Sequence, residues 1–158
     1  MDISIVITTY NYSDYVESCI KSCLNQIDTS LSYEIIVVDD GSTDNTSDIL
    51  KLYSSYSVRV FRIENSGIEK ASNFGFSKAT GDYVVRVDAD DLLLPSYLAS
   101  MENVLSNEYG FFYSNYQVID GNDRILKNIR LPEFDPREIL SRGDFLATGT
   151  LIRANILN

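Results

Sequence analysis

The sequence predicts an α/β protein, a three-layer sandwich built around a mostly parallel central sheet. Short apolar, β-branched runs, which are typical of buried strands, alternate with segments whose apolar residues recur at helical spacing. This alternation favours right-handed crossovers that place helices on both faces of the sheet. Clusters of polar residues directly follow several of the strands. In an open α/β sheet such clusters meet at the carboxyl edge of the strands, where ligands bind.

Four strand–helix units are expected in the first two thirds of the chain. The predicted strands cover residues 3–7, 34–38, 58–63 and 82–87. The predicted helices cover residues 13–26, 44–53, 68–79 and 95–107. Ser13 is the expected N-cap of the first helix and Thr43 or Asp44 that of the second, because their side-chain oxygens accept bonds from free N–H groups. Pro95 suits the first turn of the fourth helix.

The last third of the chain shows a less regular pattern. A fifth strand is predicted at residues 110–116, and a hairpin at residues 118–125 turns at Asp120-Gly121-Asn122-Asp123. A short helix over residues 136–141 and a strand over residues 147–153 follow. The chain stops at Asn158, soon after this strand. We therefore expect that a longer domain has been cut at this point.

The composition limits the classes of partner. The chain has 158 residues and a net charge of −10. This charge argues against a nucleic-acid-binding surface, because no basic stripe is present to neutralise phosphates. An anionic ligand would need a metal ion to bridge it to the carboxylates of the protein.

Several features bear on the cellular compartment. The chain has no apolar run of about 18 residues, so no membrane span is expected, and its N-terminus does not resemble a signal peptide. Cys19 and Cys23 stand four residues apart on a predicted helix, and the chain has no His to complete a zinc site. We expect reduced thiols in the core of a cytoplasmic protein, with a peripheral position at the inner face of a membrane as an alternative.

Three carboxylates follow the fourth predicted strand, namely Asp88, Asp90 and Asp91. In extended chain, residues i and i+2 point the same way, roughly 6.5–7 Å apart. Asp88 and Asp90 can therefore face one cavity, while Ala89 turns away. Like charges this close favour a cation between them, and an oxygen-only set suits Mg²⁺ or Mn²⁺. The alternative is a solvated turn that caps the following helix.

A second acidic strand end makes the ligand site the better interpretation. Asp39 and Asp40 follow the second predicted strand, and Gly41 comes directly after them. The alternative here is a helix-entry turn that needs glycine for a positive φ. The loop after the first strand contains Thr8 and Tyr10, and Asn65-Ser66-Gly67 follows the third, so polar or aromatic side chains from four strand ends are expected at the same edge.

These clusters resemble the motifs of glycosyltransferase family 2. The matching segments, in chain order, are Thr8-Thr9-Tyr10-Asn11, then Val38-Asp39-Asp40-Gly41-Ser42-Thr43-Asp44, then Asn65-Ser66-Gly67 with Asn73-Phe74-Gly75, and finally Gly81-Asp82-Tyr83 with Asp88-Ala89-Asp90-Asp91. The resemblance is close over residues 3–95 and loose beyond. It implies a GT-A (Rossmann-like) fold that is C-terminally truncated here. Residues 1–116 would be the nucleotide-sugar-binding core and residues 117–158 the incomplete start of an acceptor-side portion.

The resemblance also implies roles for single residues on the nucleotide side. Tyr10 would stack on a pyrimidine ring, and Thr8 would line the same pocket. Asp39 would accept the ring N–H of the base, which favours UDP, while Asp40 and Ser42 would border the pocket. Packing of Tyr10 on the sheet is the alternative for that residue.

On the phosphate side, Asp88 would bond the ribose or reach the metal through water, and Asp90 would bind Mn²⁺ or Mg²⁺ on the diphosphate. Asn65 and Gly67 are expected to make a turn. Lys70 could offset phosphate charge or be a solvated helix residue. Ser72 stands where many family members carry a basic residue.

The implied activity is metal-assisted, inverting transfer of a sugar from a nucleotide diphosphate to a hydroxyl of a glycan or other acceptor, as in polysaccharide biosynthesis. The general base is expected beyond Asn158, since Glu138 and Asp144 do not match the family motif. A second possibility is a catalytically inactive nucleotide-binding or interaction module, with oligomers formed through the truncated face. A third is a nucleotidyltransferase, although such enzymes usually carry a glycine-rich basic segment after the first strand.

Overall fold

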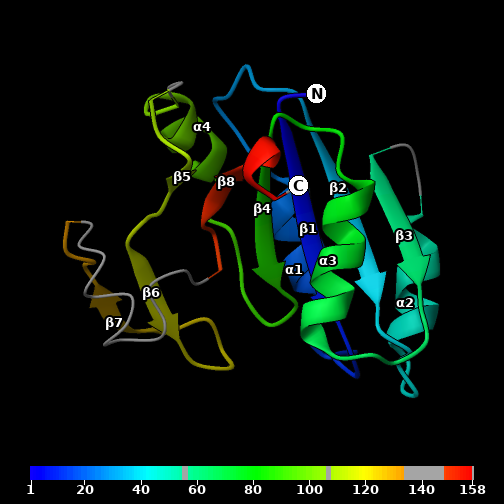
Figure 1. Cartoon of the computed structure of the whole chain (residues 1–158). Helices are drawn as coiled ribbons and strands as arrows, with labels where there is room; N and C mark the ends of the chain where they lie inside the picture. Colours follow the sequence, from blue (N-terminus) through cyan, green and yellow to red (C-terminus); the bar gives the residue numbers. More distant parts are fainter. Residues whose placement is uncertain (55–56, 106–107, 134–147, 158) are drawn as a thin grey trace.

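The computed structural model describes residues 1–54, 57–105, 108–133 and 148–157. Within these residues a six-stranded sheet with the order β3-β2-β1-β4-β8-β5 forms the centre of the molecule (Figure 1). Its strands are β1 (Ile3–Thr9), β2 (Tyr33–Asp39), β3 (Val58–Arg62), β4 (Tyr83–Asp88), β5 (Phe111–Phe112) and β8 (Leu151–Arg153). β1 to β4 are parallel, and β8 is antiparallel to β4 and β5. The predicted α/β class with a mostly parallel sheet is confirmed.

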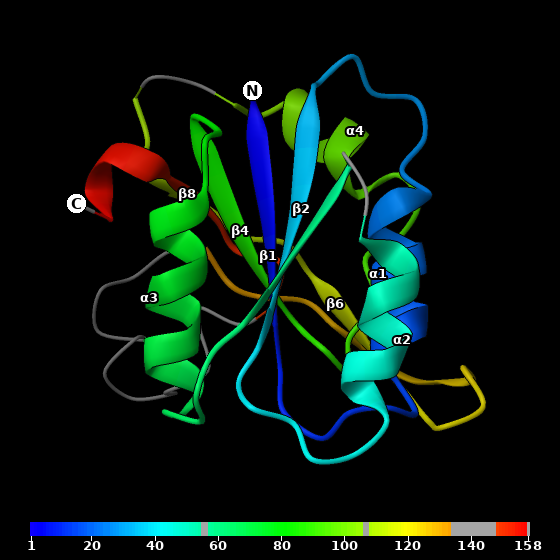
Figure 2. The same ribbon diagram turned by 90° about the vertical axis from the view of Figure 1, so that its right-hand side faces the viewer.

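Helices cover both faces of this sheet. α1 (Val16–Leu24) and α2 (Thr46–Tyr53) lie on one face, and α3 (Ile68–Lys78) lies on the other (Figure 2). α4 (Tyr97–Glu102) packs into the core cluster that also contains α1. Ile5 and Ile7 belong to the α1 side and Val6 to the α3 side, because successive side chains of a strand point to opposite faces. Burial on both faces explains why most residues of β1 are apolar and why buried positions do not alternate with exposed ones.

The helix starts differ from the predicted ones. α1 begins at Val16 and no side chain caps it, so the prediction of Ser13 as its N-cap is wrong. The backbone N–H of Ser13 instead donates to Asp44. α2 begins at Thr46, and Asp44 accepts from the backbone N–H of Thr46 at 3.0 Å. The N-cap position is Asn45, so the prediction of Thr43 or Asp44 as the N-cap is wrong, although Asp44 still supports the helix start.

The elements after β4 are shorter than predicted. α4 begins at Tyr97 after the N-cap Ser96, so the prediction that Pro95 stands in its first turn is wrong. The helix ends at Glu102, before Asn103 and Val104, both poor helix formers. β5 has only two residues, and Asn115 beyond it accepts a bond from the backbone N–H of Leu131 instead of continuing a strand. The predicted helix over residues 136–141 lies outside the described residues.

A two-stranded hairpin forms a separate sheet at the side of the molecule farthest from β3 (Figure 1). Its strands are β6 (Tyr116–Ile119) and β7 (Ile125–Ile129), which confirms the predicted hairpin around Asp120-Gly121-Asn122-Asp123. β8 returns from beyond the hairpin to lie between β4 and β5, and a 3₁₀ helix (Ala154–Ile156) follows it. Residues from the predicted second portion therefore contribute to the central sheet.

Cys19 and Cys23 are free and fully buried, as expected for core thiols. Their mutual hydrogen bond and their burial raise the pKa of Cys19, so this thiol stays protonated. Every helix in the described part of the chain is too short or too polar to span a bilayer.

Close packing of α3 on β1 gives a stability prediction. A Cβ atom on Gly75 would come within 2.4 Å of Cγ1 of Val6, a stiff side chain with no exposed surface. Gly75→Ala should therefore lower the free energy of unfolding by about 1–3 kcal/mol through overpacking, although alanine favours the helix. Urea denaturation measures this change. Ser77→Ala, on the exposed side of the same helix, is the control and should shift stability by less than about 0.5 kcal/mol.

Candidate functional site at the carboxyl edge of the sheet

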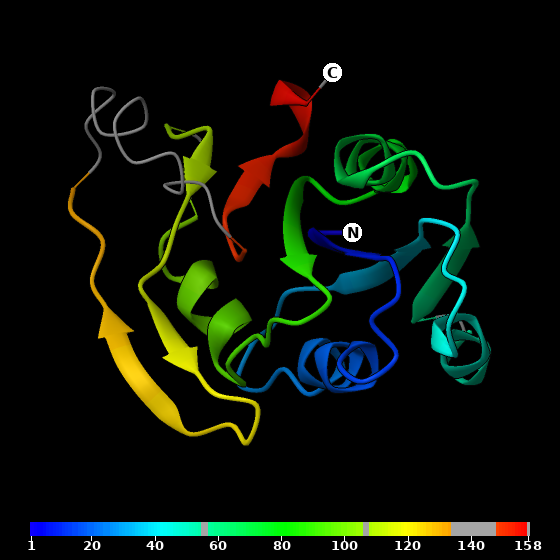
Figure 3. The same cartoon turned by 90° about the horizontal axis from the view of Figure 1, so that it is seen from below.

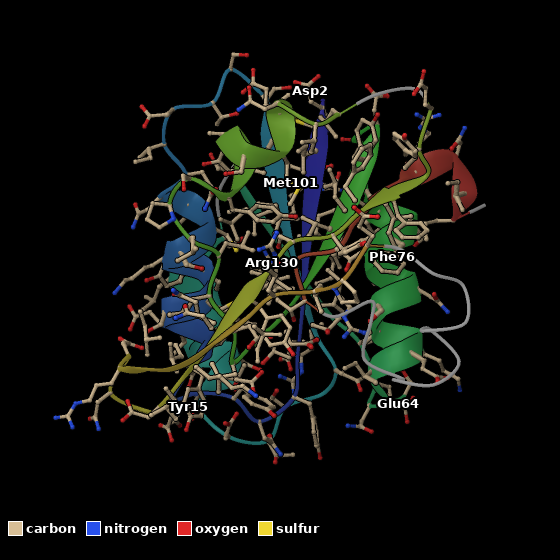
Figure 4. The ribbon with its side chains drawn as sticks, turned by 90° about the vertical axis from the view of Figure 1, so that its left-hand side faces the viewer. Asp2, Tyr15, Glu64, Phe76, Met101 and Arg130 are labelled. Carbon is tan, nitrogen blue, oxygen red and sulfur yellow. The ribbon has the colours of Figure 1, made fainter. Side chains whose placement is uncertain are left out.

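The strand register brings three strand ends together. Thr8 on β1 pairs with Val38 on β2 and with Asp88 on β4, and Thr9 pairs with Asp39. The loops that follow β1, β2 and β4 therefore leave the sheet at one edge, as expected from the sequence. Figure 3 views the molecule from this edge. In Figure 4, Tyr15 and Glu64, which follow β1 and β3, lie at this edge, whereas Asp2, which precedes β1, lies at the opposite one.

A cavity of about 510 Å³ opens at this edge. Its described walls come from the end of β1 and its loop, the residue after β2, the start of α3, and the end of β4. The lining residues are Thr8, Thr9, Tyr10, Tyr12, Asp40, Asn65, Gly67, Ile68, Ala71, Asp88, Ala89 and Asp90.

The structure brings most of the predicted site residues to this cavity. Those in its wall are Thr8, Tyr10, Asp40, Asp88 and Asp90. Asp39 and Ser42 are buried nearby and are not among the lining residues. Three further lining residues were not predicted from the sequence, namely Tyr12, Ile68 and Ala71. Tyr12 shares a loop with Tyr10, and Ile68 and Ala71 stand one helical turn apart on α3, which are the signals that could have identified them.

Asn11 fixes the loop that carries Tyr10 and Tyr12. Its φ is +58°, in the left-handed region that Asn tolerates. Its backbone N–H donates to the hydroxyl of Ser42 at 3.0 Å, and its side-chain oxygen accepts from the backbone N–H of Thr43 at 2.7 Å. The loops after β1 and β2 are thus bonded to each other, and this places the 44% exposed ring of Tyr10 at the cavity.

Asp40 joins the β2 loop to the start of α3. Its carboxylate accepts from the backbone N–H groups of Ser66 at 2.8 Å and Gly67 at 2.9 Å. Gly41, with φ +77°, is required beside it, because a Cβ atom there would lie 2.8 Å from the backbone nitrogen of Asn65. The carboxylate of Asp40 is therefore held in the cavity wall by backbone donors.

Asp39 points away from the cavity and is fully engaged. Its side chain is 1% exposed and forms an ion pair with Arg62 at 2.7 Å. It also accepts from the backbone N–H of Ser42 at 2.8 Å and from the hydroxyl of Ser47 at 2.6 Å. Burial alone would raise the pKa of Asp39, but the hydrogen bonds from Ser42, Ser47 and Arg62 outweigh it and lower that pKa. Asp39 thus stabilises the β2 loop as a charged, buried carboxylate.

At the end of β4, the Asp88 carboxylate pairs with Arg86 at 3.1 Å. The hydroxyl of Thr148 donates to the same oxygen, Oδ2, at 3.1 Å. Loss of water around the neighbouring Asp91 raises its pKa, a hydrogen bond with Thr148 lowers it, and the charges of Asp90 and Asp88 raise it further. This edge therefore concentrates negative charge that Arg86 offsets only in part.

The wall of the cavity contains polar atoms without partners. Oγ1 of Thr8, Oγ1 of Thr9 and Oδ1 of Asp88 are buried and accept or donate no hydrogen bond within the described part of the chain. A buried polar atom of this kind usually meets a ligand, water or ion. The described lining residues include three carboxylates and no basic side chain.

This donor set fits a hard divalent cation that shares its coordination with a ligand. Among the described residues no three metal-binding side chains converge on one point. Mg²⁺, however, is commonly bound through only one or two carboxylates together with phosphate oxygens and water. Asp90 and the free Oδ1 of Asp88 satisfy that requirement.

Comparison with known proteins identifies the family of this chain. The family model described as Glycosyl transferase family 2 matches residues 4–157. The chain therefore belongs to glycosyl transferase family 2.

One similar protein is an uncharacterized glycosyltransferase of Nostoc sp., 37% identical over 131 residues. The alignment covers 80% of this chain and 40% of that protein, so the chain spans less than half the length of this relative.

Two of the solved structures that resemble the chain contain a nucleotide sugar. S. aureus TarS 1-349 in complex with UDP-GlcNAc matches with a TM-score of 0.70 and 24% identity, over 99% of this chain and 46% of that one. The mannosyltransferase PcManGT from Pyrobaculum calidifontis, in complex with GDP-Man and Mn²⁺, matches with a TM-score of 0.59 and 25% identity, over 69% and 34% of the two chains. These likenesses confirm the predicted GT-A fold.

The environment of Asp39 predicts a pH-dependent loss of stability. Because its folded pKa lies below the unfolded value, this carboxylate stabilises the fold above a pH of about 4, and the contribution is lost as the pH falls through the folded pKa. Asp39→Asn should lower the free energy of unfolding at pH 7 by about 2 kcal/mol, because an NH₂ group replaces one of the two oxygens that accept from the buried donors, while Arg62 keeps access to water.

Urea denaturation between pH 7 and pH 3 measures this effect. The difference in free energy of unfolding between the unmodified chain and the Asp39→Asn variant should shrink toward pH 3. The control is Asp48→Asn, which should change stability little at either pH, because the Asp48–Lys51 pair is about three-quarters exposed. An equal loss for Asp39→Asn at both pH values would contradict the assignment.

Proposed function

We propose that this chain binds a nucleotide-sugar donor, with UDP favoured, for a metal-assisted, inverting glycosyltransferase that acts on a hydroxyl acceptor. The observation that carries the proposal is the cavity at the carboxyl edge, whose wall combines an exposed tyrosine with three carboxylates. Membership of glycosyl transferase family 2 supports it. The similar structures that contain UDP-GlcNAc or GDP-Man support it further.

The nucleoside would lie against the loop after β1. Tyr10 supplies an exposed ring at the cavity, and stacking of a base on such a ring contributes about 1–3 kcal/mol. Thr8, whose buried hydroxyl has no partner within the described residues, would bond the ligand beside it.

Asp40 is the carboxylate that we propose for the polar edge of the base, because it lines the cavity. Direct contact of the base with Asp39 would require a ligand to reach a side chain that is 1% exposed. Asp39 and Ser42 would then shape the pocket through the loop, as Ser42 bonds both Asp39 and Asn11.

The diphosphate would lie over the end of β4. Asp90 would bind Mn²⁺ or Mg²⁺, and the free Oδ1 of Asp88 would bind the same ion or a ribose hydroxyl. The ion would act as a Lewis acid that stabilises negative charge on the departing diphosphate. By holding the ion, Asp88 and Asp90 would orient the diphosphate, and Ala89 between them is small enough to leave the wall open.

The charges in the cavity would make tight binding of a diphosphate depend on a cation. A diphosphate would meet the carboxylates of Asp40, Asp88 and Asp90 with no basic side chain in the described wall. Ser72, where the family often carries a basic residue, is buried and uncharged. Lys70 is exposed on α3 and is not among the lining residues.

The acceptor side and the general base stay predictions. Glu138 and Asp144 lie outside the described residues. The glycan acceptor, the linkage and polysaccharide biosynthesis as the process are likewise inferences from the family.

Calorimetric titration with UDP tests the proposal. In the presence of Mn²⁺ the chain should bind UDP, and replacing Mn²⁺ by a chelator should weaken binding by at least about tenfold, since the carboxylates then repel the diphosphate. GDP titrated in the same way ranks the two nucleotides. Absence of UDP binding at any Mn²⁺ concentration would contradict the proposal.

Asp90→Asn should remove most of the Mn²⁺ dependence, because a carboxylate is replaced by a weaker, neutral ligand. Asp82→Asn is the matched control. Asp82 is exposed and lies at the opposite end of β4, so its loss should leave UDP binding unchanged. Equal effects of the two substitutions would place the ion elsewhere.

A further inference from the structure

The carboxylate of Asp88 is bonded through only one of its oxygens. Oδ2 accepts from Nη2 of Arg86 and from Oγ1 of Thr148, each at 3.1 Å. Oδ1 is buried and has no hydrogen-bond partner within the described part of the chain, and Asp88 lines the cavity. The two donors thus fix the orientation of the carboxylate and leave Oδ1 for a ligand.

Thr148 contacts Asp88 twice through its hydroxyl. Oγ1 accepts from the backbone N–H of Asp88 at 3.2 Å and donates to Oδ2 of Asp88 at 3.1 Å. A hydroxyl has one donor proton and two lone pairs, so both bonds form at the same time. The pair of bonds ties the carboxylate to its own backbone across 60 residues of sequence. The second carboxylate that interacts with this hydroxyl is that of Asp91.

The position of Thr148 is itself fixed by the sheet. The next residue, Gly149, donates its backbone N–H to the carbonyl of Arg86 at 3.0 Å. The carbonyl of Gly149 accepts from the hydroxyl of Tyr97, a core residue that is 7% exposed, at 2.9 Å. Gly149 has φ +80°, which favours glycine there. β8 then pairs with β4, so the hydroxyl is held at a defined point.

We infer that Thr148 is a positioning residue, which orients the Asp88 carboxylate so that Oδ1 is available to the nucleotide–metal complex in the cavity. This inference rests on the proposed function, since it supposes that such a complex binds there. Thr148 belongs to the part of the chain that follows the hairpin, so the acceptor-side portion would help to assemble the donor site. Without the hydroxyl, Asp88 would keep only Arg86 and would turn toward it.

Thr148→Val keeps the size and branching of the side chain and removes the hydroxyl. UDP titrations at a series of Mn²⁺ concentrations should show that the valine variant needs about tenfold more Mn²⁺ for half-maximal binding, the effect expected for one hydrogen bond to a charged group. Thr148→Ser, which keeps the hydroxyl, should stay within about twofold of the unmodified chain. If Thr148 acts on Mn²⁺ binding through Asp88, Asp91→Asn should also need a Mn²⁺ concentration within about twofold of that needed by the unmodified chain.

Melting temperatures of the same variants separate positioning from folding. The inference is overturned if the valine variant keeps the Mn²⁺ dependence of the unmodified chain. It is also overturned if valine and serine lower binding and melting temperature equally, or if Asp91→Asn reproduces the valine effect. If the unmodified chain binds no UDP at all, the proposed function fails and this inference fails with it.

Discussion

Parallel pairing of β1 with β2 and β4, in a register that sets Thr8 beside both Val38 and Asp88, determines the geometry of the whole carboxyl edge. The three strands end at the same level, so their loops share one small region of space. Each loop is then bonded to the next, through Asn11 and Ser42 between the first two and through Asp40 and Gly67 to α3. The cavity is what these bonded loops enclose. Hydrogen bonds between side chains and backbone N–H groups connect its walls.

The acidic residues at this edge are not equivalent, although they look alike in sequence. Asp39 is buried and charged, its ion pair with Arg62 balances that charge, and it stabilises the fold. Asp40 is bonded to backbone donors and still lines the cavity. Asp88 is paired on one oxygen and free on the other, and Asp90 is exposed in the wall. Charge that is offset inside the protein supports structure, and charge that is left over is available to a cation.

Short apolar runs, apolar residues at helical spacing and turn residues were sufficient to predict the sheet class, α1 to α3 and the hairpin, because each pattern is typical of one kind of element. These patterns were insufficient to tell whether Ser13 is the N-cap of α1, since capping depends on tertiary bonds such as the one that Ser13 makes with Asp44. The cavity residues Thr8, Tyr10 and Asp88 could be predicted because strand ends meet at one edge. The direction in which Asp39 points and its ion pair with Arg62 could not be predicted, because both depend on the residues at which β2 and β3 end. Thr148 was also out of reach, as 60 residues separate it from Asp88.

The central claim is that the leftover carboxylates of the β4 edge bind a divalent ion together with a nucleotide diphosphate. Anomalous X-ray diffraction from crystals grown with UDP and Mn²⁺ locates the ion directly. We expect one Mn²⁺ peak in the cavity, in contact with a carboxylate oxygen of Asp90 or Oδ1 of Asp88 and with the diphosphate. An ion bound elsewhere, or UDP bound in the cavity with no ion beside these aspartates, would contradict this claim.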